Sequence, residues 1–241
     1  MNTLFRIPTR RLQDAGVDGS LFRAVLIGAT LLCVCSVQAD WPQWRFDANR
    51  SGATREAGPA TGETAWQRDL GRPDPAYDHQ YRMCADITYA PVAAAGRLFV
   101  PSNRGDAVTA FDLDTGETLW RFTTGGPVRF APVCSDETVW FGSDDGFLYA
   151  VDAASGSLKW RRRGAPADRP DSRLLVNGRL CSRWPVRGAP VRQGAVIFFG
   201  AGIWPEEGVY VCAVDARTGT LRWRTDALSF VKDGMSDHGR A

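Results

Sequence analysis

Apolar and polar positions follow the same order in three segments of the chain. In each one, an apolar run ends at an aspartate, a short turn containing glycine follows, and a second run closes on a tryptophan. The segments are AVTAFDLDTGETLW at 107–120, FLYAVDAASGSLKW at 147–160 and YVCAVDARTGTLRW at 210–223. Short apolar runs bounded by turn residues are typical of β-strands, so each segment predicts a β-hairpin.

The turn residues explain how such hairpins close. An aspartate at the end of a strand accepts hydrogen bonds from the next residues in an Asx-type turn, and a glycine supplies a positive φ at little steric cost. Six residues are therefore predicted to be structural: Asp112, Asp152, Asp215, Gly116, Gly156 and Gly219.

Four tryptophans mark equivalent positions of this repeat. A half copy, ATGETAW at 60–66, adds Trp66 to Trp120, Trp160 and Trp223, with spacings of 54, 40 and 63 residues. The shortest spacing is near the roughly 40–50 residues of one four-stranded β-propeller blade. We expect each indole to fill the seam between adjacent blades, since a tryptophan buries a large apolar area.

Further strand candidates precede each hairpin, at 90–102, 130–143 and 189–200. The predicted fold is an all-β propeller of four-stranded antiparallel blades with tryptophan docking motifs, with blades at 89–124, 129–163 and 188–225. A fragment near 62–70 supplies one more strand. Three blades and a strand do not close a propeller, so an incomplete, truncated propeller is expected, with 226–241 as a tail or the start of a further blade.

The repeat Ala-x-Asp-x-x-(Thr/Ser)-Gly-x-x-x-Trp resembles the pyrroloquinoline-quinone-like (PQQ-like) repeat over residues 60–225. Quinoprotein alcohol dehydrogenases and the propeller of outer-membrane β-barrel assembly share that repeat. The lead segment 40–59, which opens with DWPQWR, also resembles that of secreted bacterial members.

The N-terminus has the features of an export signal. Residues 24–37 carry no charge, four arginines precede them, and Val37-Gln38-Ala39 is a small-residue cleavage site. The run is shorter than the roughly 20 residues that a membrane-spanning helix needs. We predict a signal peptide at 1–39, cut after Ala39, and a periplasmic or secreted product; an uncleaved anchor is the alternative.

Charge narrows the choice of partners. Residues 1–39 hold four of the 29 Lys and Arg residues and two of the 27 Asp and Glu residues, so the remainder is formally neutral. A neutral domain has no general attraction for nucleic acid or an anionic membrane. We expect no nucleic-acid partner. We also expect that the processed chain is not an integral membrane protein.

A local excess of positive charge occurs in the insert at 161–188 between the second and third blades. Nine arginines lie between residues 161 and 192, against Asp168 and Asp171. Guanidinium groups bind carboxylate, sulfate or phosphate, and two tryptophans offer stacking surfaces for a sugar or ring. The alternative is a solvated loop whose arginines pair with neighbouring acids. The candidate ligand-binding residues are Arg163, Arg169, Arg173, Arg179, Arg183, Trp184, Arg187 and Trp204.

Catalysis is not expected. The resemblance implies PQQ with calcium and a vicinal disulfide, but residues 40–241 contain no adjacent cysteines. Asp144 and Asp145, like Asp112 and Asp114, sit on predicted turns, and His79 and His238 are isolated. We therefore predict no catalytic residue, no metal site and no cofactor. The four cysteines, Cys84, Cys134, Cys181 and Cys212, leave disulfide pairing open, with buried thiols as the alternative for Cys134 and Cys212.

Three functions stay open. The first is a non-catalytic binding or scaffolding module for a protein partner, an anionic ligand or a glycan. The second is a remnant of a PQQ-dependent oxidoreductase. The third is an assembly factor that associates through unpaired blade edges.

Overall fold

The computed structural model describes residues 40–55, 64–77 and 85–225. These residues belong to one compact unit, Val37–Ala241. The predicted signal peptide at 1–39 and tail at 226–241, together with His79, Cys84 and His238, lie outside the described residues. Within them, no helix has the length and apolar character needed to cross a membrane.

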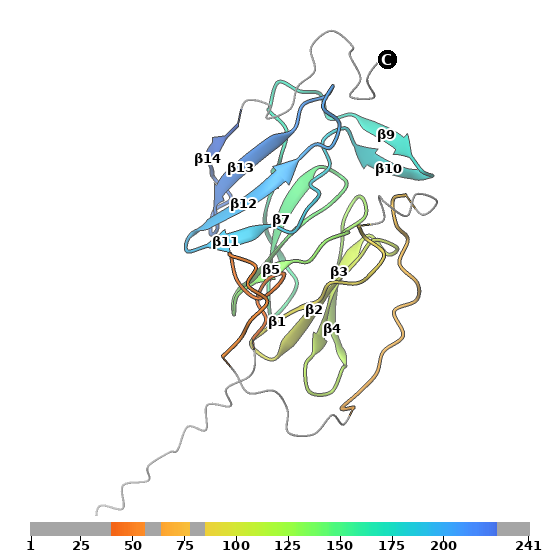
Figure 1. The fold of residues 1–241 in the computed structure, drawn as a ribbon, viewed down its shortest axis with the longest axis vertical. Coiled ribbons are helices and arrows are strands. Elements are labelled where there is room, and N and C mark those ends of the chain that lie inside the picture. Colours follow the sequence, from red (N-terminus) through yellow and green to blue (C-terminus); the bar gives the residue numbers. More distant parts are fainter. Residues whose placement is uncertain (1–39, 56–63, 78–84, 226–241) are drawn as a thin grey trace, which may run out of the picture. The chain divides into compact units, whose positions relative to one another are not determined.

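Three four-stranded antiparallel sheets form most of the described structure (Figure 1). In each sheet the strands follow one another in chain order, which is the arrangement of a propeller blade. The predicted all-β fold class is thereby confirmed.

The first blade contains β1 (Val92–Ala94), β2 (Arg97–Ser102), β3 (Ala107–Asp112) and β4 (Thr118–Thr123). The second contains β5 (Val133–Cys134), β6 (Thr138–Gly142), β7 (Phe147–Asp152) and β8 (Leu158–Arg163). The third contains β11 (Val191–Gln193), β12 (Val196–Ala201), β13 (Tyr210–Asp215) and β14 (Leu221–Arg224).

The turn between the third and fourth strands is the same in every blade. In the second blade, Asp152 Oδ1 accepts hydrogen bonds from the backbone N–H of Ser155 and from its hydroxyl, both at 2.9 Å. Gly156 then adopts a φ of 71°. Asp112 and Asp215 bind Thr115 and Thr218 in the same way. The aspartate and glycine of the repeat therefore act together in closing the hairpin.

Each blade turn also carries an indole from the preceding segment. The Nε1–H of Trp66, Trp120 and Trp160 donates to the carbonyls of Leu113, Ala153 and Ala216, at 2.8, 3.0 and 3.3 Å. The ring lies against the turn glycine so closely that a Cβ at Gly116, Gly156 or Gly219 would come within 2.5, 2.6 or 2.6 Å of it. Glycine is thus required twice, for its φ and for the space that the indole takes.

Trp223 differs from the other three. Its side chain is 47% exposed, and it contacts the ring of Phe198 in its own blade at 6.0 Å between centroids. No docking turn receives it within the part of the chain that the structure describes.

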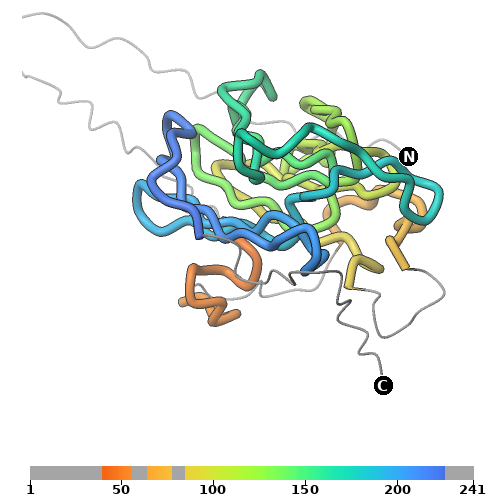
Figure 2. Tube along the Cα trace, turned by 90° about the horizontal axis from the view of Figure 1, so that it is seen from above, coloured from red at the N-terminus to blue at the C-terminus, as the bar shows by residue number. Residues whose placement is uncertain are grey.

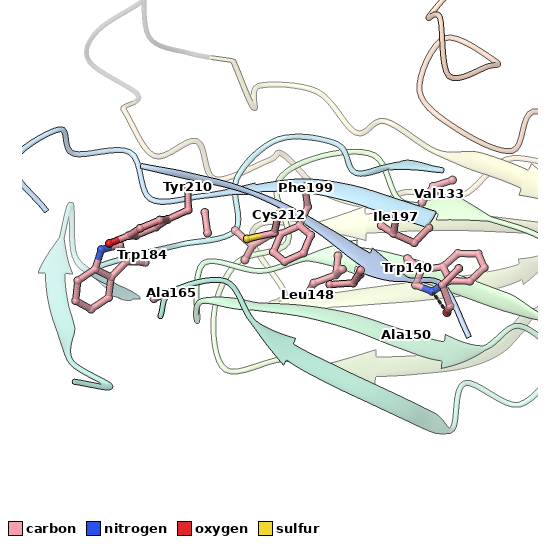
Figure 3. Close-up of a cluster of buried hydrophobic side chains, with 14 residues drawn as sticks. Val133, Trp140, Leu148, Ala150, Ala165, Trp184, Ile197, Phe199, Tyr210 and Cys212 are labelled. Atoms are coloured by element: carbon pink, nitrogen blue, oxygen red, sulfur yellow. Dashed lines mark hydrogen bonds between the residues drawn. The ribbon is translucent and has the colours of Figure 1, made fainter. Parts of the chain in front are cut away.

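Alternate residues of the second blade face opposite neighbours. Val139, Phe141 and Val151 pack with Phe99 and Val108 of the first blade. The intervening positions, such as Trp140 and Leu148, pack with Ile197, Phe199 and other residues of the third blade (Figure 3). The second blade is therefore buried on both faces, which explains its near-continuous apolar strands.

Residues 64–70, predicted as part of a fourth strand near 62–70, lie in no sheet. Trp66 docks as described, and Arg68 Nε donates to the carbonyl of Gly116 at 2.8 Å. No inner strands lie beside this segment in the described residues, so its backbone has no ladder to join.

The lead segment contacts the first strand of all three blades. Trp41 forms a β-bridge with Ala93 of β1, and the carbonyl of Pro42 accepts the N–H of Cys134 of β5 at 2.7 Å. The Gln43 side chain exchanges hydrogen bonds with the backbone of Arg192 in β11. Figure 2 shows this segment in orange against the blue strands of the third blade.

Candidate functional site

The arginine-rich insert forms a two-stranded hairpin instead of a loose loop. Strands β9 (Arg173–Val176) and β10 (Arg179–Ser182) pair in antiparallel register through a turn at Asn177 and Gly178. Both turn residues have positive φ, 48° and 77°, as the favoured two-residue hairpin turns require.

Most of the predicted ligand-binding arginines are engaged by the protein itself. Arg179 pairs with Asp74 at 2.8 Å and also with Asp106, and Arg183 pairs with Glu207 at 2.6 Å. Burial raises the pKa of Asp106, and the charge of Arg179 opposes that rise. These pairs match the alternative in which the insert's arginines meet neighbouring acids.

Two other arginines of the set bind backbone carbonyls. Arg163 donates to the carbonyls of Arg169 and Pro170 at 2.7 and 2.6 Å, and Arg173 donates to the carbonyl of Gly125 at 2.9 Å. Within the described residues, neither guanidinium pairs with a carboxylate.

A buried charged cluster lies beneath the hairpin. Asp144, which is 1% exposed, accepts Nε of Arg129 at 2.7 Å and both Nε and Nη2 of Arg187 at 2.8 Å. Arg129 also pairs with Asp86 at 2.5 Å. Burial lowers the pKa of Arg187, but its hydrogen bonds and charge interaction with Asp144 prevail and raise it. Two carboxylates and two guanidiniums thus neutralise each other in this cluster.

This cluster corrects the prediction for Asp144. We expected Asp144 and Asp145 to serve hairpin geometry, and Asp145 does so, because its carboxylate accepts the N–H of Phe147 at 3.1 Å and the hydroxyl of Tyr149 at 2.6 Å. Asp144 instead binds arginines that lie 15 and 43 residues away in the sequence. Sequence reasoning also missed Asp86 and Arg129, because single charged residues in loops carry no local pattern.

The prediction that Trp184 offers a stacking surface to a ligand is wrong. The ring is 2% exposed and belongs to the core between the second and third blades (Figure 3). Its Nε1–H donates to the carbonyl of Glu207 at 2.8 Å. Trp204 lies in the connection between β12 and β13, where its carbonyl accepts the N–H of Glu207 at 3.0 Å. The two tryptophans therefore help to fix the segment that holds Arg183.

A cavity of about 380 Å³ lies beside the cluster. Arg129 lines it together with residues of the lead and of the segments before β1, β5 and β11, among them Trp44, Arg50 and Phe130. The guanidinium of Arg50 lies 4.7 Å from the centre of the Trp44 ring. Of the two arginines in this lining, Arg129 is already paired with Asp86 and Asp144, so Arg50 is the cation beside the aromatic ring.

The described residues do not fit a calcium ion. They include no group of three or more His, Cys, Asp and Glu side chains that could hold a metal ion, and Asp144 is committed to two arginines. Calcium takes six or more oxygen ligands. The described cysteines, Cys134, Cys181 and Cys212, are free and buried, and burial raises the pKa of each.

The sequence of this chain is similar to those of two groups of known proteins. The family described as "Outer membrane protein assembly factor BamB" matches residues 52–226. The outer membrane protein assembly factor BamB of Yersinia pestis is 26% identical over 189 residues, which cover 76% of this chain and 42% of that protein. The dehydrogenase subunit of the quinone alcohol dehydrogenase of Gluconacetobacter polyoxogenes is 32% identical over 146 residues, 56% of this chain and 19% of that protein.

Solved structures agree on the fold. Quinohemoprotein alcohol dehydrogenase from Comamonas testosteroni superposes with a TM-score of 0.53 at 22% identity, covering 77% of this chain and 27% of that one. The chain thus spans less than half the length of these relatives.

Proposed function

The chain belongs to the family of the outer membrane protein assembly factor BamB, and from this membership we propose that it is a non-catalytic binding or scaffolding propeller. The proposed location is the periplasm, in keeping with the predicted signal peptide and with relatives named for outer membrane assembly. A protein partner or an anionic ligand is its proposed target.

The mutual neutralisation of charged side chains around Asp144 carries this proposal. A general base or a metal site needs a carboxylate free to accept a proton or a cation. Asp144 instead holds Arg129 and Arg187, while Asp74 and Asp106 hold Arg179. Such pairs hold the side chains beneath the hairpin in fixed positions, which suits the binding of a ligand or protein better than catalysis.

Arg169 and Arg173 are the side chains proposed for contact with an anion. Arg173 is exposed and Arg169 is partly exposed, and neither pairs with a carboxylate among the described residues. The other arginines of the set contribute by holding the hairpin in place.

Retention on a heparin matrix tests this site. The wild-type chain should elute at a higher salt concentration than the double variant Arg169→Gln/Arg173→Gln, because screened contacts between exposed charges weaken with salt. Arg104→Gln/Arg217→Gln removes two exposed arginines from turns of the first and third blades and is the matched control. Binding that is unmeasurable, or that does not change with salt, would overturn the anion site.

A PQQ-dependent oxidoreductase is the second candidate, favoured by the 32% identity to dehydrogenase subunits. A titration with PQQ and calcium distinguishes the two, because a saturable change in quinone absorbance is expected only of a quinoprotein. We expect no such change.

A further inference from the structure

The hairpin β9–β10 has an edge that pairs with nothing in the described residues. It forms a sheet of two strands, with β10 on one side of β9 and no third strand on the other (Figure 1). β10 is tied to the second blade, because the N–H of Ser182 donates to the carbonyl of Asp144 at 2.7 Å. The open edge is therefore that of β9, over Arg173–Val176.

The outward face of this hairpin is apolar. Leu175 and Leu180 lie directly opposite each other in the register and are 73% and 57% exposed. Because side chains alternate along a strand, Arg173 lies on the same face as Leu175. The face thus carries two adjacent leucines, and Arg173 lies two residues along β9 on the same face.

The hairpin is held rigidly although it is small. At its tip, the Asn177 side chain donates to the carbonyl of Ala76, and Arg179 pairs with Asp74 and Asp106. At its base, Arg173 donates to the carbonyl of Gly125. An isolated two-stranded hairpin is marginal in water, so these anchors keep an edge and an apolar face in one fixed position.

Charge indicates the partner. The Arg173 guanidinium carries five N–H groups and donates to the carbonyl of Gly125, and it has no carboxylate partner in the described part of the chain. Arg169 lies close in sequence on the approach to β9. A strand that complements this edge would therefore carry acidic side chains between its apolar ones.

We propose that β9 is a docking edge for an extended polypeptide segment of a partner protein, in which apolar residues alternate with acidic ones. The segment adds to the sheet as a third strand, its apolar side chains cover Leu175 and Leu180, and a carboxylate pairs with Arg173. This assignment rests on the proposed function of the chain as a binding module. Main-chain hydrogen bonds supply affinity in such strand addition, and alternate side chains supply specificity.

The anchored tip favours a protein partner over a lipid surface. A hairpin that enters a membrane presents its tip to the apolar phase, whereas the tip residue Asn177 is held against Ala76. The exposed leucines lie on the flat face of the strands, where a partner strand and its side chains can cover them.

A peptide titration with the full chain tests this edge. The probe is a ten-residue peptide in which valine alternates with glutamate, followed by fluorescence anisotropy. We expect saturable binding that is about tenfold weaker for Leu175→Thr/Leu180→Thr, since threonine keeps the strand propensity but removes most of the apolar area. Leu119→Thr/Leu158→Thr is the control, because these leucines are 46% and 49% exposed on β4 and β8 of the blades.

Two further probes complete the test. A peptide with all of its backbone N–H groups methylated should not bind, because both of its edges are blocked, and one with lysine in place of glutamate should bind at least about tenfold more weakly. Equal binding of the methylated peptide, or equal loss in both leucine variants, would overturn strand addition. Vesicles of phosphatidylglycerol and phosphatidylethanolamine that bind the wild type and not Leu175→Thr/Leu180→Thr would assign the face to a membrane and overturn the proposal.

The outcome is separable from that of the proposed function. If the peptide does not bind while heparin retains the wild type more strongly than Arg169→Gln/Arg173→Gln, the docking edge fails and the binding module stands. If neither probe binds, both proposals fail.

Discussion

At the scale of single residues, the fold depends on glycines that meet two demands at once. Gly156 has a φ of 71°, and the indole of Trp120 lies against it. Gly194, in the turn between β11 and β12, has a similar φ of 58° but nothing within 4 Å of its Cβ position. A comparison of the two positions therefore separates the energetic cost of a side chain at positive φ from the cost of overpacking against the indole.

Alanine at these two positions should have different effects. Gly194→Ala should lower the free energy of unfolding by about 1 kcal/mol, the cost of a left-handed residue with a Cβ. Gly156→Ala adds overpacking against the Trp120 ring and should cost about 2–4 kcal/mol in total. Urea denaturation followed by circular dichroism measures both. Equal losses would show that no indole is seated on Gly156.

Asp144 is the residue on which the charged cluster depends. Asp144→Asn removes the charge that faces Arg129 and Arg187, both of which stay largely buried. We expect a loss of about 3–5 kcal/mol in the free energy of unfolding, as for other buried pairs that lose one partner. Asp168→Asn, at an exposed site in the insert, should change stability by less than about 0.5 kcal/mol. Similar results for the two variants in urea denaturation would contradict the cluster.

At the scale of elements, the three blade turns share one electrostatic feature. The backbone N–H of Ser155 holds the pKa of Asp152 at about 2, and a hydrogen bond from Arg222 does the same for Asp215. The backbone N–H of Thr115 likewise lowers the pKa of Asp112. In the unfolded chain an aspartate titrates near 4, so the folded state favours the ionised form.

These shifts predict the direction of the acid response. A carboxyl with a lowered folded pKa stabilises the fold above about pH 4, and this contribution is lost as the pH falls toward 2. The midpoint of urea unfolding should therefore decrease from pH 5 to pH 2.5. It should decrease less in Asp112→Asn/Asp152→Asn/Asp215→Asn, in which the turns no longer titrate. The same decrease in both proteins would exclude the turn aspartates as its source.

The blade hairpins could be predicted because their information is local. The strand, the aspartate, the glycine and the tryptophan lie within fourteen residues of one another, so the three sheets lie inside the ranges expected from the repeat. Residues 64–70 were expected to belong to a strand, but strand formation requires neighbours that the sequence of the segment cannot provide.

The candidate site could be predicted only in part. The insert and its excess of arginine are visible in the sequence, but their pairing is not, because Asp74 lies 105 residues from Arg179 and Asp144 lies 43 residues from Arg187. Trp184 was misassigned for a similar reason. Burial of a tryptophan in an insert depends on Glu207 and the strands of the third blade, which lie elsewhere in the sequence.

At the scale of the whole molecule, no strand of one blade pairs with a strand of the next blade, and side chains join the blades. Apolar residues fill each seam, and an indole hydrogen-bonded to the next turn closes it. The lead adds a second connection, because it contacts β1, β5 and β11 in turn. The proposed binding surfaces all depend on this arrangement, since the insert leaves the second blade and is anchored to residues of both neighbours.

Hydrogen exchange of the indole N–H groups, resolved by nitrogen-15 NMR, tests this arrangement most directly. The indoles of Trp120 and Trp160 donate to the carbonyls of Ala153 and Ala216, while the side chain of Trp223 is 47% exposed. Slow exchange is expected for Trp120 and Trp160, and rapid exchange for Trp223. Exchange of all three at the same rapid rate would show that the indoles are not seated in the seams, and would contradict the propeller on which the proposed functions rest.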